Sequence, residues 1–163
     1  MTRDGLDGER FKAVLFATEG VLTSTSDGVT VNPGVVRWLE HLRRLGKRTA
    51  VVSSSSNSVP ALDGAAISAL FDACVDADDI ERLGLRGKPA PDRYLEAASR
   101  LTVHPMQAVL VEHALAGVAA GRTGGFGLVI GVASKAARAE LCAAGAHLVV
   151  DDLEELVEWR SDS

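Results

Sequence analysis

Polar and charged residues cluster directly after the apolar runs of this sequence or just before a helical stretch. The four clusters are Thr18-Glu19-Gly20, Ser53-Ser54-Ser55-Ser56-Asn57, Gly87-Lys88-Pro89 and Glu112-His113-Ala114. The hydroxyl groups of Ser53 and Ser54, backbone N–H groups at a helix start and the Lys88 ammonium could together hold an anion. Alternatively, the serine run only turns the chain and caps a helix, and Lys88 is an ordinary surface lysine.

Glu112 and His113 are the candidate metal ligands, although two ligands are few. A carboxylate next to an imidazole suits a metal softer than Mg²⁺, because Mg²⁺ prefers oxygen ligands. The alternative is that His113 is a loop histidine with no role as a metal ligand. We favour this alternative for His113.

Apolar runs alternate with helical patterns along most of the chain and so predict the elements that must position these residues. Strands are expected at 14–16, 49–52, 73–75, 108–111, 128–132 and 148–150, and helices at about 33–45, 59–70, 92–101, 114–123, 135–144 and 153–159. Residues 76–86 are expected to be an irregular acidic connection. The pattern predicts a three-layer α/β/α, Rossmann-like parallel sheet of five to six strands, whose ligands bind at the carboxyl ends of the strands.

Length and composition predict one domain. The chain has 163 residues, of which 47% are hydrophobic and 24% charged, with a formal net charge of −5. We expect a single domain over 1–163, with a core at about 12–157 and flexible ends at 1–10 and 160–163. The negative charge argues against a nucleic-acid or membrane partner.

The remaining bulk features predict a cytoplasmic protein. No apolar run is long enough to cross a membrane, and the first ten residues lack the pattern of a signal peptide. Cys74 and Cys142 are expected to be reduced and buried, because two isolated thiols do not make a disulfide framework. Trp38 and Trp159 are expected to be packing residues.

Taken in order, the four clusters resemble the motifs of the haloacid dehalogenase (HAD) superfamily, and within it the β-phosphoglucomutase and sugar-phosphate phosphatase branch. The resemblance covers roughly residues 12–156. The family's motifs are Asp-x-Asp-Gly-Val-Leu after the first strand, a Ser or Thr ending the second strand, a Lys before Pro, and Glu-Asp-Ala-x-x-Gly after the fourth strand. They align with Ala17-Thr18-Glu19-Gly20-Val21-Leu22, Ser53, Lys88 and Glu112-His113-Ala114-Leu115-Ala116-Gly117.

The resemblance implies a role for each motif. In the family the first aspartate attacks phosphorus and forms a covalent aspartyl phosphate, and the second protonates the leaving oxygen and then activates water. The serine and the lysine hold the phosphate. The acids of the fourth motif bind Mg²⁺ together with the first aspartate.

This chain departs from the family pattern at three of these positions. Ala17 stands at the position of the nucleophile, and a methyl group can neither attack phosphorus nor bind a metal. Removal of a nucleophile typically costs on the order of 10⁶ in kcat. Glu19 keeps the carboxylate of the acid/base position on a longer side chain. His113 replaces one metal acid, while Glu112 is retained, so Mg²⁺ is expected only if some activity remains.

The branch also carries a helical cap between its first two motifs, and here the interval from Ala17 to Ser53 is too short for one. Much of it is taken by the helix expected from Pro33. Residues 23–31 are typical of a hairpin, because Asp27-Gly28 favours a tight turn between strands. We therefore expect a capless core.

These losses favour a catalytically degenerate domain that acts in binding, regulation or assembly. Similar degenerate domains occur beside or within actinobacterial trehalose-phosphate phosphatases, which is an analogy of fold alone. The expected ligand is phosphate or a phosphorylated small molecule, and a protein partner or a homodimer is plausible. Two alternatives remain: a weak phosphomonoesterase that uses Glu19 and Lys88, and a purely structural oligomerisation domain.

Overall fold

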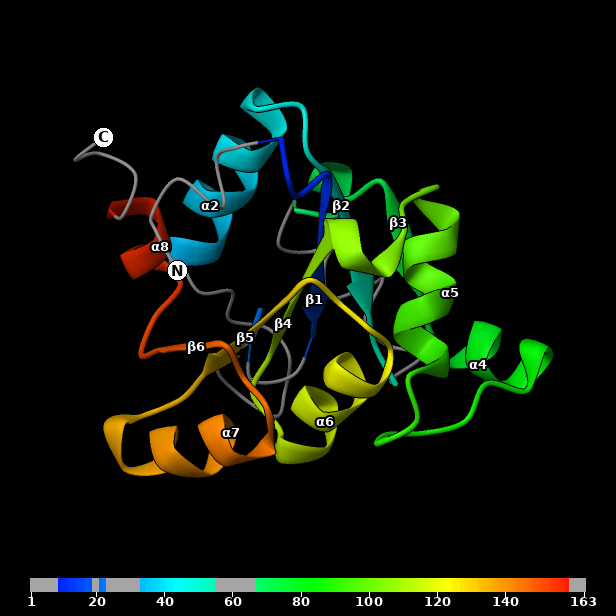
Figure 1. Ribbon diagram of the computed structural model, residues 1–163. Helices are drawn as coiled ribbons and strands as arrows, with labels where there is room; N and C mark the ends of the chain where they lie inside the picture. Colours follow the sequence, from blue (N-terminus) through cyan, green and yellow to red (C-terminus); the bar gives the residue numbers. More distant parts are fainter. Residues whose placement is uncertain (1–8, 19–20, 23–32, 55–66, 159–163) are drawn as a thin grey trace.

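A six-stranded parallel sheet forms the centre of the molecule. The computed structural model describes residues 9–18, 21–22, 33–54 and 67–158 (Figure 1). The strands are β1 (Ala13–Ala17), β2 (Arg48–Val52), β3 (Ala73–Val75), β4 (Ala108–Glu112), β5 (Leu128–Val132) and β6 (Leu148–Val150), in the order β3-β2-β1-β4-β5-β6. All neighbouring pairs are parallel. The predicted fold class and all six strands are confirmed.

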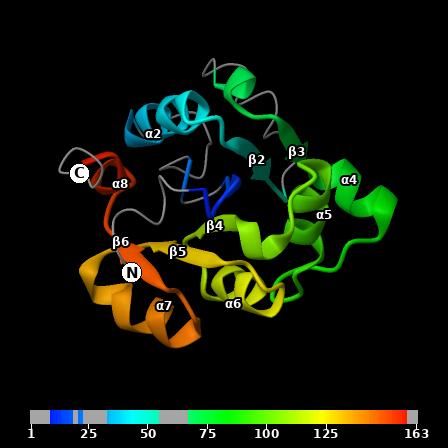
Figure 2. The ribbon, with the colours of Figure 1, turned by 45° about the horizontal axis from the view of Figure 1, so that its top comes forward.

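Helices cover both faces of this sheet. They are α2 (Pro33–Arg44), α4 (Ala77–Leu83), α5 (Asp92–Arg100), α6 (Leu115–Thr123), α7 (Arg138–Ala144) and α8 (Glu154–Glu158), with short 3₁₀ turns at Ser68–Leu70, Pro105–Gln107 and Lys135–Ala137. Figure 2 shows α2 and α8 on one side of the sheet and α5, α6 and α7 on the other. The chain therefore leaves β1 toward one face and β4 toward the other, and the point between these two neighbouring strands is the topological switch point of the sheet.

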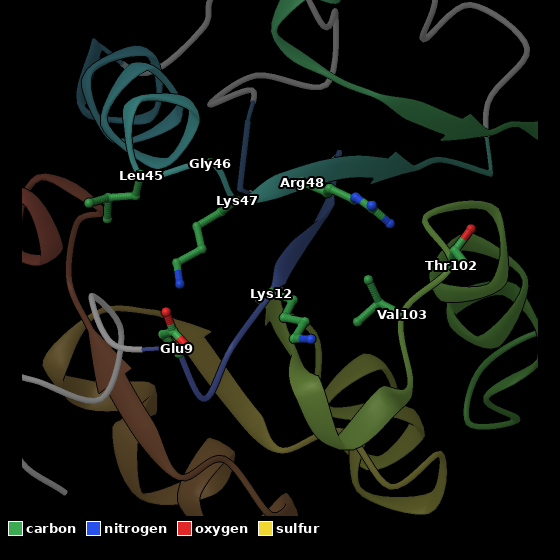
Figure 3. Close-up of a pocket in the computed structure, with 8 residues that line it drawn as sticks. All are labelled: Glu9, Lys12, Leu45, Gly46, Lys47, Arg48, Thr102 and Val103. Carbon is green, nitrogen blue, oxygen red and sulfur yellow. The ribbon is translucent and has the colours of Figure 1, made fainter.

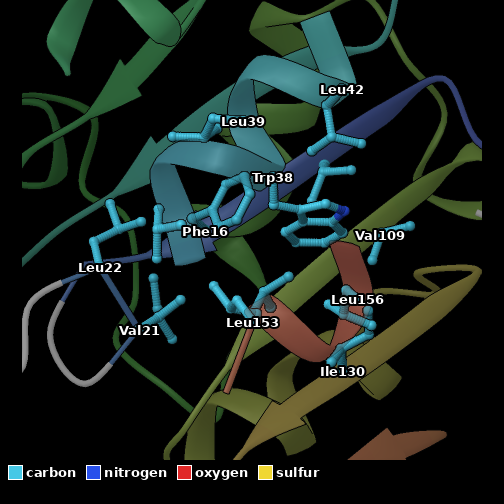
Figure 4. Close-up of a cluster of buried hydrophobic side chains, with 14 of the residues drawn as sticks. Phe16, Val21, Leu22, Trp38, Leu39, Leu42, Val109, Ile130, Leu153 and Leu156 are labelled. Carbon is cyan, nitrogen blue, oxygen red and sulfur yellow. The ribbon is translucent and has the colours of Figure 1, made fainter. Parts of the chain in front are cut away.

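Large side chains fill the layer between the sheet and the helices α2 and α8. Trp38 and Leu39 of α2 are at most 1% exposed, and Leu153 at the start of α8 is fully buried. Phe16 of β1 meets Trp38 edge-on, with ring centroids 5.4 Å apart. Figure 4 shows these side chains gathered with Ile130 of β5. The expected packing role of Trp38 is confirmed.

On the opposite face of the sheet, alanine and glycine residues of α5 and α6 let these helices approach the strands closely. Ala97 of α5 and Ala120 of α6 are fully buried. A methyl group on Gly121 of α6 would lie 2.7 Å from a Leu110 carbon of β4, closer than packed carbons come. This layer carries the residues that reach the carboxyl end of β4.

The end of α2 is the glycine stop that the sequence predicts. Gly46 has φ of 76°. Its N–H donates to the carbonyl of Arg43, and the N–H of Lys47 donates to the carbonyl of Leu42. A left-handed residue at this position is tolerated best when it is glycine.

The prediction of an irregular connection over residues 76–86 was wrong, because α4 lies within it. Asp76 caps the helix by accepting a hydrogen bond from the N–H of Asp79, and the Asp79 carboxylate accepts from the N–H of Asp76. This reciprocal capping satisfies donors at the start of the helix. Gly84 ends it in the left-handed conformation.

Three smaller expectations change as well. Cys74 and Cys142 are both free thiols, but Cys142 is exposed and Cys74 only partly buried. The helix expected at 135–144 begins as the 3₁₀ turn Lys135–Ala137 before α7. Of the helix expected at 59–70, the described residues show only the 3₁₀ turn Ser68–Leu70.

Several expectations lie outside the described residues. They concern Glu19, the hairpin at 23–31, Trp159 and the chain ends, and they remain predictions, as do the absence of a cap and the domain limits. Among the helices of the described residues, no helix is both long and apolar enough to cross a membrane.

Candidate functional site

The strand register places three of the singled-out positions at one edge of the sheet. Ala17, the last residue of β1, pairs with Val52, so Ser53 follows directly on the neighbouring strand β2. On the other side Phe16 pairs with Val111, so Ala17 and Glu112 are the next residues of adjacent strands. The switch point therefore holds a buried methyl group, with Ala17 3% exposed, between a hydroxyl and a carboxylate.

Glu112 is the most completely bonded group of this edge. Its side chain has no exposed surface. Lys88 Nζ donates to Oε1 at 2.7 Å, and the Tyr94 hydroxyl donates to the same oxygen at 2.8 Å. Oε2 accepts from the backbone N–H groups of His113 at 3.1 Å and Ala114 at 2.9 Å. Each carboxylate oxygen thus already accepts two hydrogen bonds, as a buried carboxylate requires.

An ion pair holds the loop that carries Lys88. The carboxylate of Asp92, at the start of α5, accepts from the backbone N–H, Nε and Nη2 of Arg86 at 2.9–3.0 Å. Arg86 holds the pKa of the Asp92 carboxyl below its usual value by these hydrogen bonds. The closed loop contains a turn, in which the N–H of Ala90 donates to the carbonyl of Gly87, and a cis Lys88–Pro89 peptide bond.

One residue of the site, Tyr94, was missed by sequence reasoning, and Gly117 was named only as the last residue of the fourth motif. Tyr94 is fully buried on α5, and its ring lies 5.9 Å from the ammonium of Lys88. Gly117 lies over Glu112, where a methyl group would come within 2.1 Å of the carboxyl carbon. Tyr94 is the only tyrosine of the chain, and a buried tyrosine usually finds a hydrogen-bond partner, so its hydroxyl is a signal that the sequence did offer.

The hydroxyl groups near Ala17 differ in their availability. The Thr18 hydroxyl donates to the carbonyl of Val52 at 3.2 Å, so its proton is engaged with the backbone. Ser53 is 1% exposed, and its N–H donates to the carbonyl of Val75 at 2.8 Å. Ser54 is exposed. The structure thus places Ser53 inside the edge and Ser54 at its surface.

The donor set of this edge fits Mg²⁺ poorly. Both Glu112 oxygens are occupied by hydrogen bonds, and the Ala17 side chain carries no oxygen. His113 is exposed, and its hydrogen bond to Glu112 comes from its backbone N–H. Within the described ranges no group of three or more His, Cys, Asp or Glu residues could hold a metal ion. A metal ion bound by Glu112 would have to break the Lys88–Glu112 pair.

The residues singled out from the sequence are therefore only partly united. Lys88 and Glu112 are in direct contact, and Ser53 lies at the same edge of the sheet as Glu112. Ser54 and His113 face solvent, and Glu19 lies outside the described residues. The described residues thus form an ion pair, Lys88–Glu112, beside the buried methyl group of Ala17.

A second charged cluster lies at the start of α4, which follows β3. Arg100 donates to Asp79 at 3.1 Å and to Glu96 at 3.0 Å. The hydrogen bond from Arg100 lowers the pKa of the Asp79 carboxyl well below its usual range. Burial, together with the charges of Asp76 and Asp79, raises the pKa of the Cys74 thiol to about 11. The Arg100–Asp79 ion pair of this cluster ties α5 to α4.

A family model described as haloacid dehalogenase-like hydrolase matches residues 2–125. A β-phosphoglucomutase of Mycobacterium tuberculosis is 42% identical over 134 residues, which are 80% of this chain and 51% of that protein. A trehalose-phosphate phosphatase of Mycobacterium leprae is 34% identical over 161 residues, which are 96% of this chain and 34% of that protein. The chain thus spans about half the length of the first relative and a third of the second.

The solved structures agree with the fold. CbbY from Rhodobacter sphaeroides, crystallised in complex with phosphate, has a TM-score of 0.73 and 20% identity, over 90% of this chain and 96% of that chain. At this identity the likeness shows the fold alone. The family model, in contrast, covers well over half of this sequence. The chain therefore belongs to the haloacid dehalogenase-like hydrolase family.

Proposed function

We propose that this domain binds phosphate or a phosphorylated small molecule at the carboxyl edge of its sheet without hydrolysing it. The observation that carries the proposal is Ala17, a buried methyl group at the switch point where the family places its attacking carboxylate. No covalent phosphoenzyme can form on a methyl group. The bound ligand would then regulate this domain or its assembly with a protein partner.

The Lys88–Glu112 pair supports the same reading. A carboxylate that accepts four hydrogen bonds has no lone pair left for a metal, and metal binding would first have to displace the ammonium. The pair holds itself together without an added cation, and its negative charge is balanced inside the protein. This arrangement favours a resting site that needs no Mg²⁺.

An anion can still be held, because an ammonium group has three N–H donors. One donor of Lys88 points to Glu112, and its side chain is 26% exposed, so the others can reach a ligand. Ser53 lies at the end of β2 on the same edge. The nearby Glu112 charge opposes a second anion, so the affinity should be modest. Phosphate bound to CbbY shows that this fold accommodates the ligand in a relative.

The test combines binding with turnover. Phosphate binding is measured by calorimetry on the wild-type protein, on Lys88→Met and on Lys135→Met. Lys135 is an exposed lysine in the 3₁₀ turn after β5 and serves as the matched control. We expect saturable binding that Lys88→Met weakens by about tenfold or more, as the loss of a charge-assisted bond predicts. Lys135→Met should leave it unchanged.

Turnover is measured with p-nitrophenyl phosphate and with sugar phosphates, in Mg²⁺ and in Mn²⁺. The wild-type protein should show no activity above background. A variant that carries both Ala17→Asp and His113→Asp tests whether the lack of these two carboxylates is the reason for the inactivity. Metal-dependent turnover by the wild type that Glu19→Ala abolishes would overturn the proposal in favour of a weak phosphatase. A stable oligomer that binds no phosphate would favour a structural module.

A further inference from the structure

A hollow lies at the opposite end of the sheet from Ala17 and Glu112. Its volume is about 440 Å³, within the range of small-molecule pockets. It is lined by Glu9, Lys12, Leu45, Gly46, Lys47, Arg48, Thr102 and Val103 (Figure 3). These residues precede β1, β2 and β4 or begin them, so the hollow sits where the strands enter the sheet.

The lining is positive in a protein whose net charge is negative. Lys12, Lys47 and Arg48 face one carboxylate, Glu9, whereas the whole chain carries a formal charge of −5. Figure 3 shows the Lys47 side chain extending from the start of β2 on the side of Glu9, whereas the Lys12 side chain ends on the side of Val103. Clefts of one sign attract ligands of the other and raise their local concentration.

Helix ends account for part of this charge. Arg48 donates to the carbonyl of Leu101 at the end of α5, where a cation compensates the negative end of the helix. Lys12 belongs to no helix, and its ammonium makes no hydrogen bond or ion pair with the described part of the chain. Its backbone is held on both sides, since its N–H donates to Gln107 and its carbonyl accepts from Arg48. The backbone of Lys12 is thus fixed, and its exposed side chain carries the ammonium at the hollow.

Thr102 gives a second, independent observation. It has φ of 57°, and no other non-glycine residue of the described chain has positive φ. The position ends α5, with the N–H of Thr102 donating to Ser99 and that of Val103 to Ala98. Glycine is the residue that costs least there, whereas a β-branched residue stores backbone strain. The strained residue brings a hydroxyl group to the wall of the hollow.

We infer that this hollow, defined by Lys12, Lys47, Arg48 and Thr102, is a binding site for a small polyanion, separate from the phosphate site at the other end of the sheet. The ligand class is a molecule with two or more adjacent negative groups, such as a diphosphate. Two ammonium groups, a guanidinium edge and a hydroxyl match its acceptor oxygens. Three cations against one carboxylate, Glu9, leave the lining positively charged, and a positive lining attracts a doubly charged anion more strongly than a singly charged one.

The experiment is a titration of the ¹⁵N-labelled protein with inorganic pyrophosphate at constant ionic strength, followed by backbone amide shifts. We expect saturable shifts at residues 12, 46–48 and 102–103. Lys12→Gln and Lys47→Gln should each weaken the binding by about tenfold. These side chains lie at the surface, and the amide spectrum of each variant reports whether it is folded.

The remaining two lysines of the chain are the controls, because Lys88 serves the other site and Lys135 neither. Lys88→Met and Lys135→Gln should leave the shifts at the hollow unchanged. Three outcomes would overturn the inference: shifts confined to the carboxyl edge of the sheet, no saturation at millimolar pyrophosphate, or equal weakening by Lys135→Gln. Failure at the hollow with intact phosphate binding at Lys88 would refute this inference and leave the proposed function standing.

Discussion

Replacing Glu112 with glutamine tests whether the buried pair at the carboxyl edge stabilises the fold. All four donors around Glu112 point at carboxylate oxygens, and the NH₂ group of a glutamine can accept from none of them. Breaking a buried ion pair by removing one partner costs about 3–5 kcal/mol. Lys88 is 26% exposed and recovers part of its hydration. We therefore expect Glu112→Gln to lower the free energy of unfolding by about 3 kcal/mol, at the lower end of this range.

Urea denaturation followed by circular dichroism measures this change, provided that the slope of the transition stays constant. Glu96→Gln is the matched control, because Glu96 pairs with Arg100 at 3.0 Å while 29% exposed. A pair of that kind contributes less than about 1 kcal/mol. A loss below about 1 kcal/mol for Glu112→Gln would refute the reasoning, since the buried carboxylate would then stabilise the fold no more than a surface one.

The other predictions concern three separate places in the fold. Gly117→Ala puts a methyl carbon 2.1 Å from the Glu112 carboxyl carbon, and overpacking of this kind should cost about 2–3 kcal/mol in the same urea assay. The pKa of Asp79 is lowered in the folded protein, so the ionised carboxylate stabilises the fold above its unfolded pKa of about 3.9, and this contribution is lost as the pH falls further. Asp79→Asn should therefore flatten the decline in the free energy of unfolding between pH 5 and pH 3. With a thiol reagent at pH 8, exposed Cys142 should react within minutes and Cys74, whose pKa is about 11, only after unfolding.

The fold was largely predictable from the sequence because parallel strands buried on both faces appear as continuous apolar runs. The run Ala108–Val111 is one example, and every residue of β4 is buried. The prediction failed at α4, where acidic residues were interpreted as a loop. Asp76 and Asp79 are spaced as a reciprocal cap, but the same residues also suit a solvated turn, and only Ile80 and Leu83 could have favoured a helix.

The residues of the site were predictable from the sequence, but the hydrogen bonds between them were not. The order of the clusters placed Ser53, Lys88 and Glu112 at one edge of the sheet. The bond between Lys88 and Glu112 depends on how the α5 loop packs against β4, which no local pattern encodes. Tyr94 occupies a position that helical periodicity assigns to the core, so its hydroxyl group went unnoticed.

The outermost strands of the sheet have a consequence for self-association. β3 and β6 are the outermost strands of the sheet within the described residues, and each has three residues. An outermost strand this short offers too few main-chain groups for a neighbouring molecule to add a strand to the sheet. Strand addition is also the route to fibrils. A homodimer of this protein would therefore be built from side chains on its helices, and surface substitutions there, rather than strand-breaking ones, would dissociate it.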